Sequence, residues 1–185
     1  GTLTLSNNND FAGSVTVSAG TLTLSGINSG ITGITVNAGT LTLSGANTFN
    51  ANTTLNAGTL NINHAQALGD SNDNILIING GTLNNSSAAA IVMTYNHPIQ
   101  LNGNFTFTGT KNLTFGTGAV TVSTNLQATI SAGVLTFGGT VNDNYNITKA
   151  GAGTLTISSN YTLTANRVFT VNAGEFIFSG VVSGA

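Results

Sequence analysis

A six-residue phrase, Gly-Thr-Leu-Thr-Leu-Ser, returns at a fixed interval and constrains the fold more than any other feature of this chain. Its three identical copies begin at Gly1, Gly20 and Gly39, and a related copy begins at Gly58, so the interval is the same each time. Within every copy, apolar residues alternate with hydroxyl or amide residues, which is the pattern of a strand with one buried face. A period of about 20 residues built on such strands predicts a solenoid.

Later parts of the chain carry less regular copies and a second kind of strand. Copies that open with glycine occupy residues 81–84, 133–137, 153–158 and 174–179. Before most copies lies another alternating run, as in residues 15–19 and 34–38, which ends in Ser or Asn and then Ala-Gly. Glycine adopts positive φ without steric cost, and asparagine tolerates it next best, so Ala-Gly predicts a corner between two strands.

These patterns predict an all-β fold, a parallel β-helix (β-solenoid) of about nine turns of about 19–23 residues each, with no helices. A fixed repeat with like segments in like positions favours stacking each strand on its copy one turn later over closing it into hairpins. At about 4.8 Å per turn, the rod would be about 43 Å long. We expect residues 1–185 to form a single segment of a longer array, with regular 19-residue repeats in 1–80 and drifted repeats in 81–185.

Composition narrows the classes of partner. The charged side chains are Lys111, Lys149, Arg167, Asp10, Asp70, Asp73, Asp143 and Glu175, against 31 Thr and 27 Asn. Scattered cations and a net charge of −2 exclude a phosphate-tracking patch and a polybasic membrane site, so we expect no nucleic-acid partner. No apolar run reaches the ~18 residues of a membrane span, so no membrane insertion of this segment is expected. The absence of cysteine removes disulfide and thiolate-metal frameworks.

Residues 39–49, 53–60 and 149–158 resemble the autotransporter-associated β-strand repeat, which is also called the passenger-associated transport repeat. The resemblance covers most of the chain. It implies a right-handed parallel β-helix in a long secreted or surface-displayed bacterial protein, exported in autotransporters through an outer-membrane barrel. The resemblance brings no catalytic residues with it.

Two groups of residues are candidates for metal sites. Residues 70–74, with the sequence Asp-Ser-Asn-Asp-Asn, resemble the start of a calcium loop, but Ile75 stands where that loop needs Gly and Gly81 where it needs Glu. His64 and His97 have no neighbouring Cys or His, whereas zinc sites need three or four convergent donors. We therefore predict a solvated turn at Asp70–Asp73, a turn or strand edge at His97-Pro98, and no metal ligands.

Catalysis is not expected either. Polysaccharide-cleaving enzymes need clustered carboxylates, often with Arg or Lys nearby. Asp70 and Asp73 are the one close acidic pair, and no Lys or Arg lies near them in sequence. We predict that the chain is not an enzyme, has no catalytic or cofactor-binding residues, and uses no cofactor.

Aromatic residues are expected to serve the core. One set falls at apolar positions of alternating strands: Phe105, Phe107, Phe115, Phe137, Phe169, Phe176 and Phe178. We predict that these rings are buried. Tyr95, Tyr145 and Tyr161 lie in or next to loops, where they could stack on sugars, although three isolated rings do not form a binding platform.

Outward threonines suggest a rival function. If Leu3 and Leu5 face inward, then Thr-x-Thr pairs face outward at residues 2/4, 21/23, 40/42 and 154/156. Such pairs form a flat hydroxyl and methyl array like that of ice-binding β-solenoids. The array is interrupted by Asn61 and Asn84, and later by Glu175 and Ile177, and threonine also has high strand propensity.

We predict a non-enzymatic structural or adhesive repeat protein, extracellular or on the bacterial cell surface, that acts as a rod, spacer or fibre-forming unit. Its partners would be copies of itself, end to end or side by side, or surface glycans. The alternatives are an ice-binding solenoid and a glycan-binding passenger domain. End-to-end continuation is suggested because residues 184–185 followed by 1–6 nearly repeat residues 151–158, which fits a longer solenoid continued covalently or by stacked copies.

Overall fold

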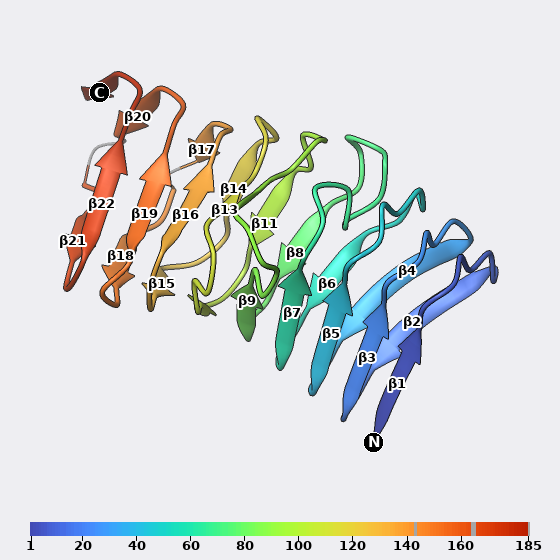
Figure 1. Cartoon of the computed structure of the whole chain (residues 1–185). Helices are drawn as coiled ribbons and strands as arrows, with labels where there is room; N and C mark the ends of the chain where they lie inside the picture. Colours follow the sequence, from blue (N-terminus) through green and yellow to red (C-terminus); the bar gives the residue numbers. More distant parts are fainter. Residues whose placement is uncertain (143, 164–165, 185) are drawn as a thin grey trace.

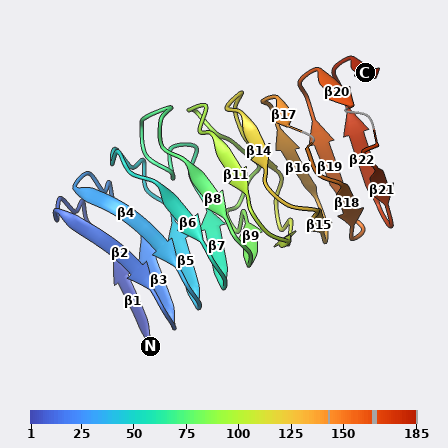
Figure 2. The same cartoon turned by 180° about the vertical axis from the view of Figure 1, so that it is seen from behind.

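The computed structural model describes residues 1–142, 144–163 and 166–184, and within these ranges every regular element is a β-strand. Each strand pairs in parallel with the equivalent strand one turn later, so the chain coils into a β-solenoid (Figure 1). The chain rises along β1 on the near side and returns along β2 on the far side, and the coil is right-handed (Figures 1 and 2). The predicted parallel β-helix without helices is confirmed for the described residues.

One sheet, called here the long sheet, runs the whole length of the rod. Its nine strands are β1 (Thr2–Leu5), β3 (Thr21–Leu24), β5 (Thr40–Leu43), β7 (Thr59–Ile62), β9 (Thr82–Asn84), β12 (Phe105–Phe107), β15 (Leu126–Ile130), β18 (Ile147–Ala150) and β21 (Phe169–Val171). Nine passes correspond to about eight turns, close to the predicted nine. The register keeps the interval of the sequence phrase as far as Thr59, whereas the step from Thr82 to Thr106 is slightly longer than any step that was predicted.

A second sheet, the return sheet, lies behind the long sheet. It contains β2 (Gly13–Val17), β4 (Ile31–Val36), β6 (Thr53–Leu55), β8 (Leu76–Ile78), β11 (Ile99–Leu101), β14 (Val120–Val122) and β17 (Val141–Asn142), and a separate pair is formed by β20 (Tyr161–Leu163) and β23 (Val182–Gly184). The predicted Ala-Gly corners join it to the long sheet. Gly39 has φ of 73°, and a Cβ there would overlap the carbonyl oxygen of Gly20, so both the turn and the close stacking of corners require glycine.

A third sheet begins only in the middle of the chain. Its strands are β10 (Ile91–Val92), β13 (Leu113–Thr114), β16 (Val134–Phe137), β19 (Thr154–Ile157) and β22 (Glu175–Phe178). The glycine-led copies at residues 133–137, 153–158 and 174–179 therefore belong to the third sheet, whereas the earlier copies form the long sheet. The expectation that like segments keep like positions is wrong here. The later turns are longer and hold an additional strand, and the glycine corner has moved one sheet onward.

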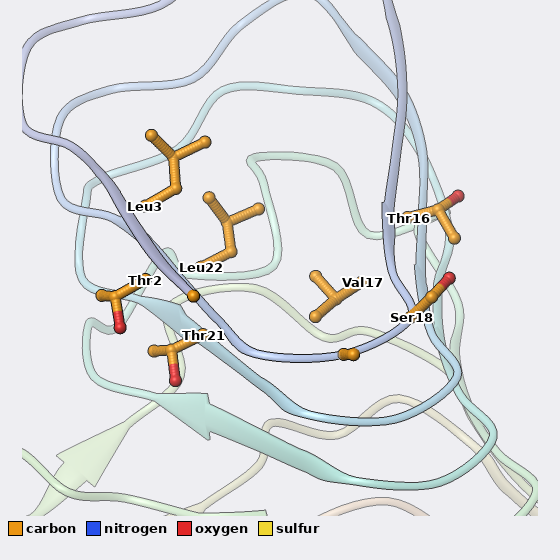
Figure 3. Close-up of a pocket in the computed structure, with 9 residues that line it drawn as sticks. Thr2, Leu3, Thr16, Val17, Ser18, Thr21 and Leu22 are labelled. Carbon is orange, nitrogen blue, oxygen red and sulfur yellow. The ribbon is translucent and has the colours of Figure 1, made fainter.

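The interior is a stack of apolar side chains that begins behind the first turn. Leu41 is fully buried, whereas Leu3, which no turn covers, is 55% exposed. Figure 3 looks at this end and shows Leu3, Leu22 and Val17 pointing inward. Thr2 and Thr21 point outward in the same view, so the predicted alternation is confirmed.

Candidate functional site

Threonines of the long sheet form an outward column that is longer than predicted. Direct register partners connect Thr2, Thr21, Thr40, Thr59, Thr82, Thr106 and Thr129. The neighbouring column changes from Thr42 to Asn61 and Asn84, as predicted, and these amides donate hydrogen bonds of 2.9 and 3.2 Å down the column. Thr154 and Thr156 were expected in the same array, but they lie in the third sheet on another face. The Thr-x-Thr array therefore spans only the first three turns.

Asparagine side chains next to either end of a strand tie successive turns together. In each case Oδ1 accepts the backbone N–H of a residue one turn later, as Asn52 does from Ile75 at 2.9 Å and Asn104 from Gln127 at 2.7 Å. The same bond is made by Asn63, Asn112, Asn125, Asn146 and Asn160. These amides extend the main-chain ladder past the ends of the strands, which explains much of the asparagine content.

Two asparagine columns also pair through their side chains. On the exposed corner after the return sheet, Asn102 donates to Asn79, Asn79 to Asn56 and Asn56 to Asn37, at 2.9, 2.6 and 2.8 Å. We call these four residues the corner ladder. A second column comprises Asn9, Asn28 and Asn47, in which Asn28 and Asn47 are completely buried. It runs with the opposite polarity, from Asn9 to Asn28 to Asn47, and ends on the carbonyl oxygen of Ala67.

Lys149 is a fully buried cation that the sequence patterns did not single out. Its Nζ donates to the backbone oxygens of Ala150, Gly151 and Ala173 at 3.0, 2.7 and 2.9 Å, which clamps two successive turns at a corner. Burial lowers the pKa of Lys149. The alternation of β18 held the signal, because Ile147 faces inward and Lys149 lies two residues further on.

His97 is also buried, and its Nδ1 lies within hydrogen-bond distance of the carbonyl oxygen of Asn74, at 3.2 Å. Because a carbonyl only accepts, Nδ1 carries the proton, and Nε2 has no partner among the described residues. Burial lowers the pKa of His97, and hydrogen bonds with backbone groups of Asn74 and Ser71 oppose that shift. As predicted, His97-Pro98 immediately precedes a strand, β11.

The predicted metal candidates do not come together. Asp70 and Asp73 are exposed in a turn, where the N–H of Asp73 bonds to Ser71 Oγ, as expected for a solvated turn. His64 uses Nδ1 to accept the N–H of Gln66. In the part of the chain that the structure describes, no three His, Asp or Glu residues form a metal-sized group. Asp143 lies outside that part.

Aromatic side chains follow the prediction in part. Phe105, Phe107, Phe115 and Phe137 are buried, and Phe169, Phe176 and Phe178 are half-buried in the last turns. Tyr161 lies next to a loop, as expected, but it is 1% exposed and packs against Phe169 and Phe178, so its ring is not available to stack on a sugar. The ring could not stay at the surface because its position in β20 faces the interior. Tyr145 is 38% exposed.

Two depressions mark the outside of the rod. One, of about 370 Å³, is the open mouth of the first turn drawn in Figure 3, and its floor includes Leu3 and Leu22. The other, of about 240 Å³, is a shallow polar groove lined by Asn104, Asn125, Leu126, Gln127, Asn146 and Thr148. No helix able to span a membrane occurs within the described ranges.

Comparison with protein-family models finds the passenger-associated-transport-repeat in four segments, residues 1–23, 19–42, 37–62 and 147–176. Together these segments make up about half of the chain and include turns from both ends of the rod. No curated protein and no solved structure gave a significant match. The repeat phrase, the parallel solenoid and the family matches agree, and the chain belongs to the passenger-associated transport repeat family.

Proposed function

We propose that this chain is a non-enzymatic structural and adhesive segment of a secreted or surface-displayed passenger, and that it works as a rod or spacer. The observation that carries this proposal is the long sheet, which runs through all nine passes of the chain in parallel pairing. Because every turn is bonded to its neighbours along one axis, such a rod can span a distance and bear force, and it needs no pocket to do so.

The adhesive mode that we propose is self-association, in which a further turn, from the same chain or from another copy, continues the rod along its axis. The inward Leu3 is exposed on the first turn, Leu22 one turn later is half-buried, and Leu41 two turns later is fully buried. A turn stacked on β1, from the same chain or from another copy, would cover Leu3 and pair the edge of β1. A contact between unlike ends does not close on itself and so extends into a filament.

Electron microscopy and a bead assay test this proposal. The purified chain should appear as thin rods that join end to end as concentration rises. Beads coated with the chain should aggregate, and soluble chain should inhibit this aggregation. Monomers that stay separate at every concentration, together with beads that remain dispersed, would contradict the self-adhesive role. Polysaccharide cleavage by the chain would contradict the non-enzymatic assignment.

Ice binding is a second candidate because the unbroken column of seven threonines along the long sheet favours it. It ranks lower because the second column turns from threonine to asparagine at Asn61, which removes the flat paired array after three turns. Faceted ice crystals in the presence of the chain, abolished by Thr21→Tyr and Thr40→Tyr together, would place it first. Unshaped crystals would remove it.

A further inference from the structure

The corner ladder contains two kinds of asparagine that differ in the next residue. Asn37 and Asn56 precede alanine, whereas Asn79 and Asn102 precede glycine, and these are the two Asn-Gly dipeptides of the chain. All four asparagines are exposed and occupy the same position after a strand of the return sheet. The ladder is therefore an internal comparison in which the surroundings are alike and the following residue changes.

The backbone nitrogen that follows each asparagine is held differently in the two kinds. The N–H of Ala38 donates to the carbonyl oxygen of Val17 at 3.2 Å, and that of Ala57 to Val36 at 3.3 Å. The N–H groups of Gly80 and Gly103 make no hydrogen bond to any described residue. Glycine also lacks the Cβ that hinders approach to the backbone nitrogen of alanine.

The two Asn-Gly residues differ in how firmly the ladder holds their amides. Asn79 donates from Nδ2 to Asn56 and accepts at Oδ1 from Asn102, so both of its amide atoms are engaged. Asn102 is the last member, and its Oδ1 accepts no hydrogen bond from the described residues. Its side chain therefore has one restraint where Asn79 has two.

We propose that Asn102 is a site of spontaneous deamidation in the folded protein, and that Asn79 reacts second. The backbone nitrogen of Gly103 loses its proton and forms a bond to Cγ of Asn102, and the side-chain nitrogen leaves as ammonia. Water then opens the resulting cyclic imide at either carbonyl, which yields aspartate or isoaspartate. The only co-reactant is water, and no oxidant or reductant is needed.

The product breaks the ladder at its weakest member. A carboxylate at position 102 cannot donate to Asn79 Oδ1, so the 2.9 Å bond is replaced by repulsion between two oxygens. Isoaspartate also lengthens the backbone at a corner where turns are closely packed. Gly103 cannot be exchanged to avoid the reaction, because a Cβ there would overlap the carbonyl oxygen of Asn79. The stacking of turns thus imposes the reactive dipeptide.

Peptide mapping by mass spectrometry after incubation of the folded chain at mildly alkaline pH tests the proposal. Conversion at Asn102 should be several-fold faster than at Asn79, and Asn37 and Asn56 should stay intact over the same period. In urea the two Asn-Gly sites should react at equal rates, because the ladder is then absent. Equal conversion at all four positions of the folded chain, or none at Asn102 while the unfolded chain reacts, would overturn it.

Two variants separate the chemistry from its consequence. Asn102→Gln should abolish conversion at this position, since glutamine forms the cyclic imide far more slowly. Asn102→Asp should reproduce the melting temperature of the aged protein, and Asn104→Asp, two residues away and outside the ladder, serves as the matched charge control. If Asn102→Asp and Asn104→Asp melted at the same temperature as the unaged chain, the ladder would not be the structure that deamidation breaks.

Discussion

Residues 1–62 and residues 76–178 use the same strand phrase but close the third side of the solenoid in different ways. In the first region, each short turn holds two strands, and the connecting loops are stacked through the amides of Asn9, Asn28 and Asn47, of which the last two are fully buried. In the second region, longer turns hold three strands, and the third sheet takes the place of the loops. Side-chain amides thus replace a main-chain ladder where the turn is too short for a third strand.

The change between the two regions is made by one loop. The connection from β7 to β8, residues 63–75, contains the first lengthening of the repeat. The carbonyl oxygen of Ala67 accepts the last hydrogen bond of the buried column, from Asn47 at 2.7 Å. The carbonyl oxygen of Ala65 accepts the N–H of Thr94, just after the first strand of the third sheet, at 2.9 Å. The column of asparagine amides therefore ends at this loop, and the third sheet begins there.

The largest expected effect tests whether the phrase keeps its inward position when it changes sheet. Leu41→Asp in the long sheet and Leu155→Asp in the third sheet both put an unpaired charge into the core, because both leucines are buried. Each should cost at least about 5 kcal/mol and prevent folding. Thermal melts by circular dichroism provide the measurement. Thr42→Ala and Thr156→Ala, the outward neighbours, should melt near the parent, and a melting point shared by both classes would refute the inward assignment.

Lys149→Met should give the next largest effect, and only the later region has such a clamp among the described residues. Removal of the ammonium leaves the inward oxygens of Ala150, Gly151 and Ala173 without their donor, which should cost about 3 kcal/mol in the free energy of unfolding. Urea titration measures the loss. Lys111→Met removes the same charge from an exposed site and should change little. Equal stability of the two variants would show that the three carbonyls do not need Lys149.

How far the sequence predicts this molecule follows from what each pattern encodes. Alternation with glycine corners identifies strands and their inward faces, because those depend on neighbours in sequence, and Leu41 and Thr42 lie as expected. The sheet to which a strand belongs depends on the length of the whole turn. The copy at residues 153–158 therefore resembles the earlier copies and still lies on another face. The buried Asn47, His97 and Lys149 depend on partners a full turn away, which local patterns do not specify.

Asn28→Ala should have a smaller effect, and it should distinguish the first region, which is closed by the asparagine column, from the second region, which is closed by the third sheet. Asn28 is completely buried, donates to Asn47 and Gly26, and accepts from Asn9, so its removal should cost about 2 kcal/mol. Asn112 in the later region is tied to the next turn by one exposed bond, beside a real sheet. Asn112→Ala should cost less than about 1 kcal/mol. If urea titrations showed that the two variants lose the same free energy of unfolding, the asparagine column would not be what closes the third side of the solenoid in the first region.

The smallest expected effect concerns pH and involves His97, which lies in the second region, shortly after the loop that separates the two regions. His97 is held neutral by burial, with its pKa lowered from an ordinary value of 6.5. The unfolded chain takes up a proton below that pH, while the folded chain resists because Nε2 faces no acceptor among the described residues. Stability should therefore be constant above about pH 7 and fall as the pH drops through 6.5 toward the lower folded pKa.

Melting temperatures between pH 7.5 and 5.5, where Asp and Glu remain ionised, isolate this effect. The parent should lose several degrees over the interval, and His97→Gln, which keeps a donor for the carbonyl oxygen of Asn74, should lose much less. His64→Gln controls for the other histidine, whose Nδ1 sits in a local turn with Gln66. A parent and a His97→Gln variant with parallel pH profiles would mean that His97 charges as easily in the fold as in the open chain. The interior beside Asn74 would then have to admit water, and the dry stack of apolar side chains would not be continuous between the first and the second region.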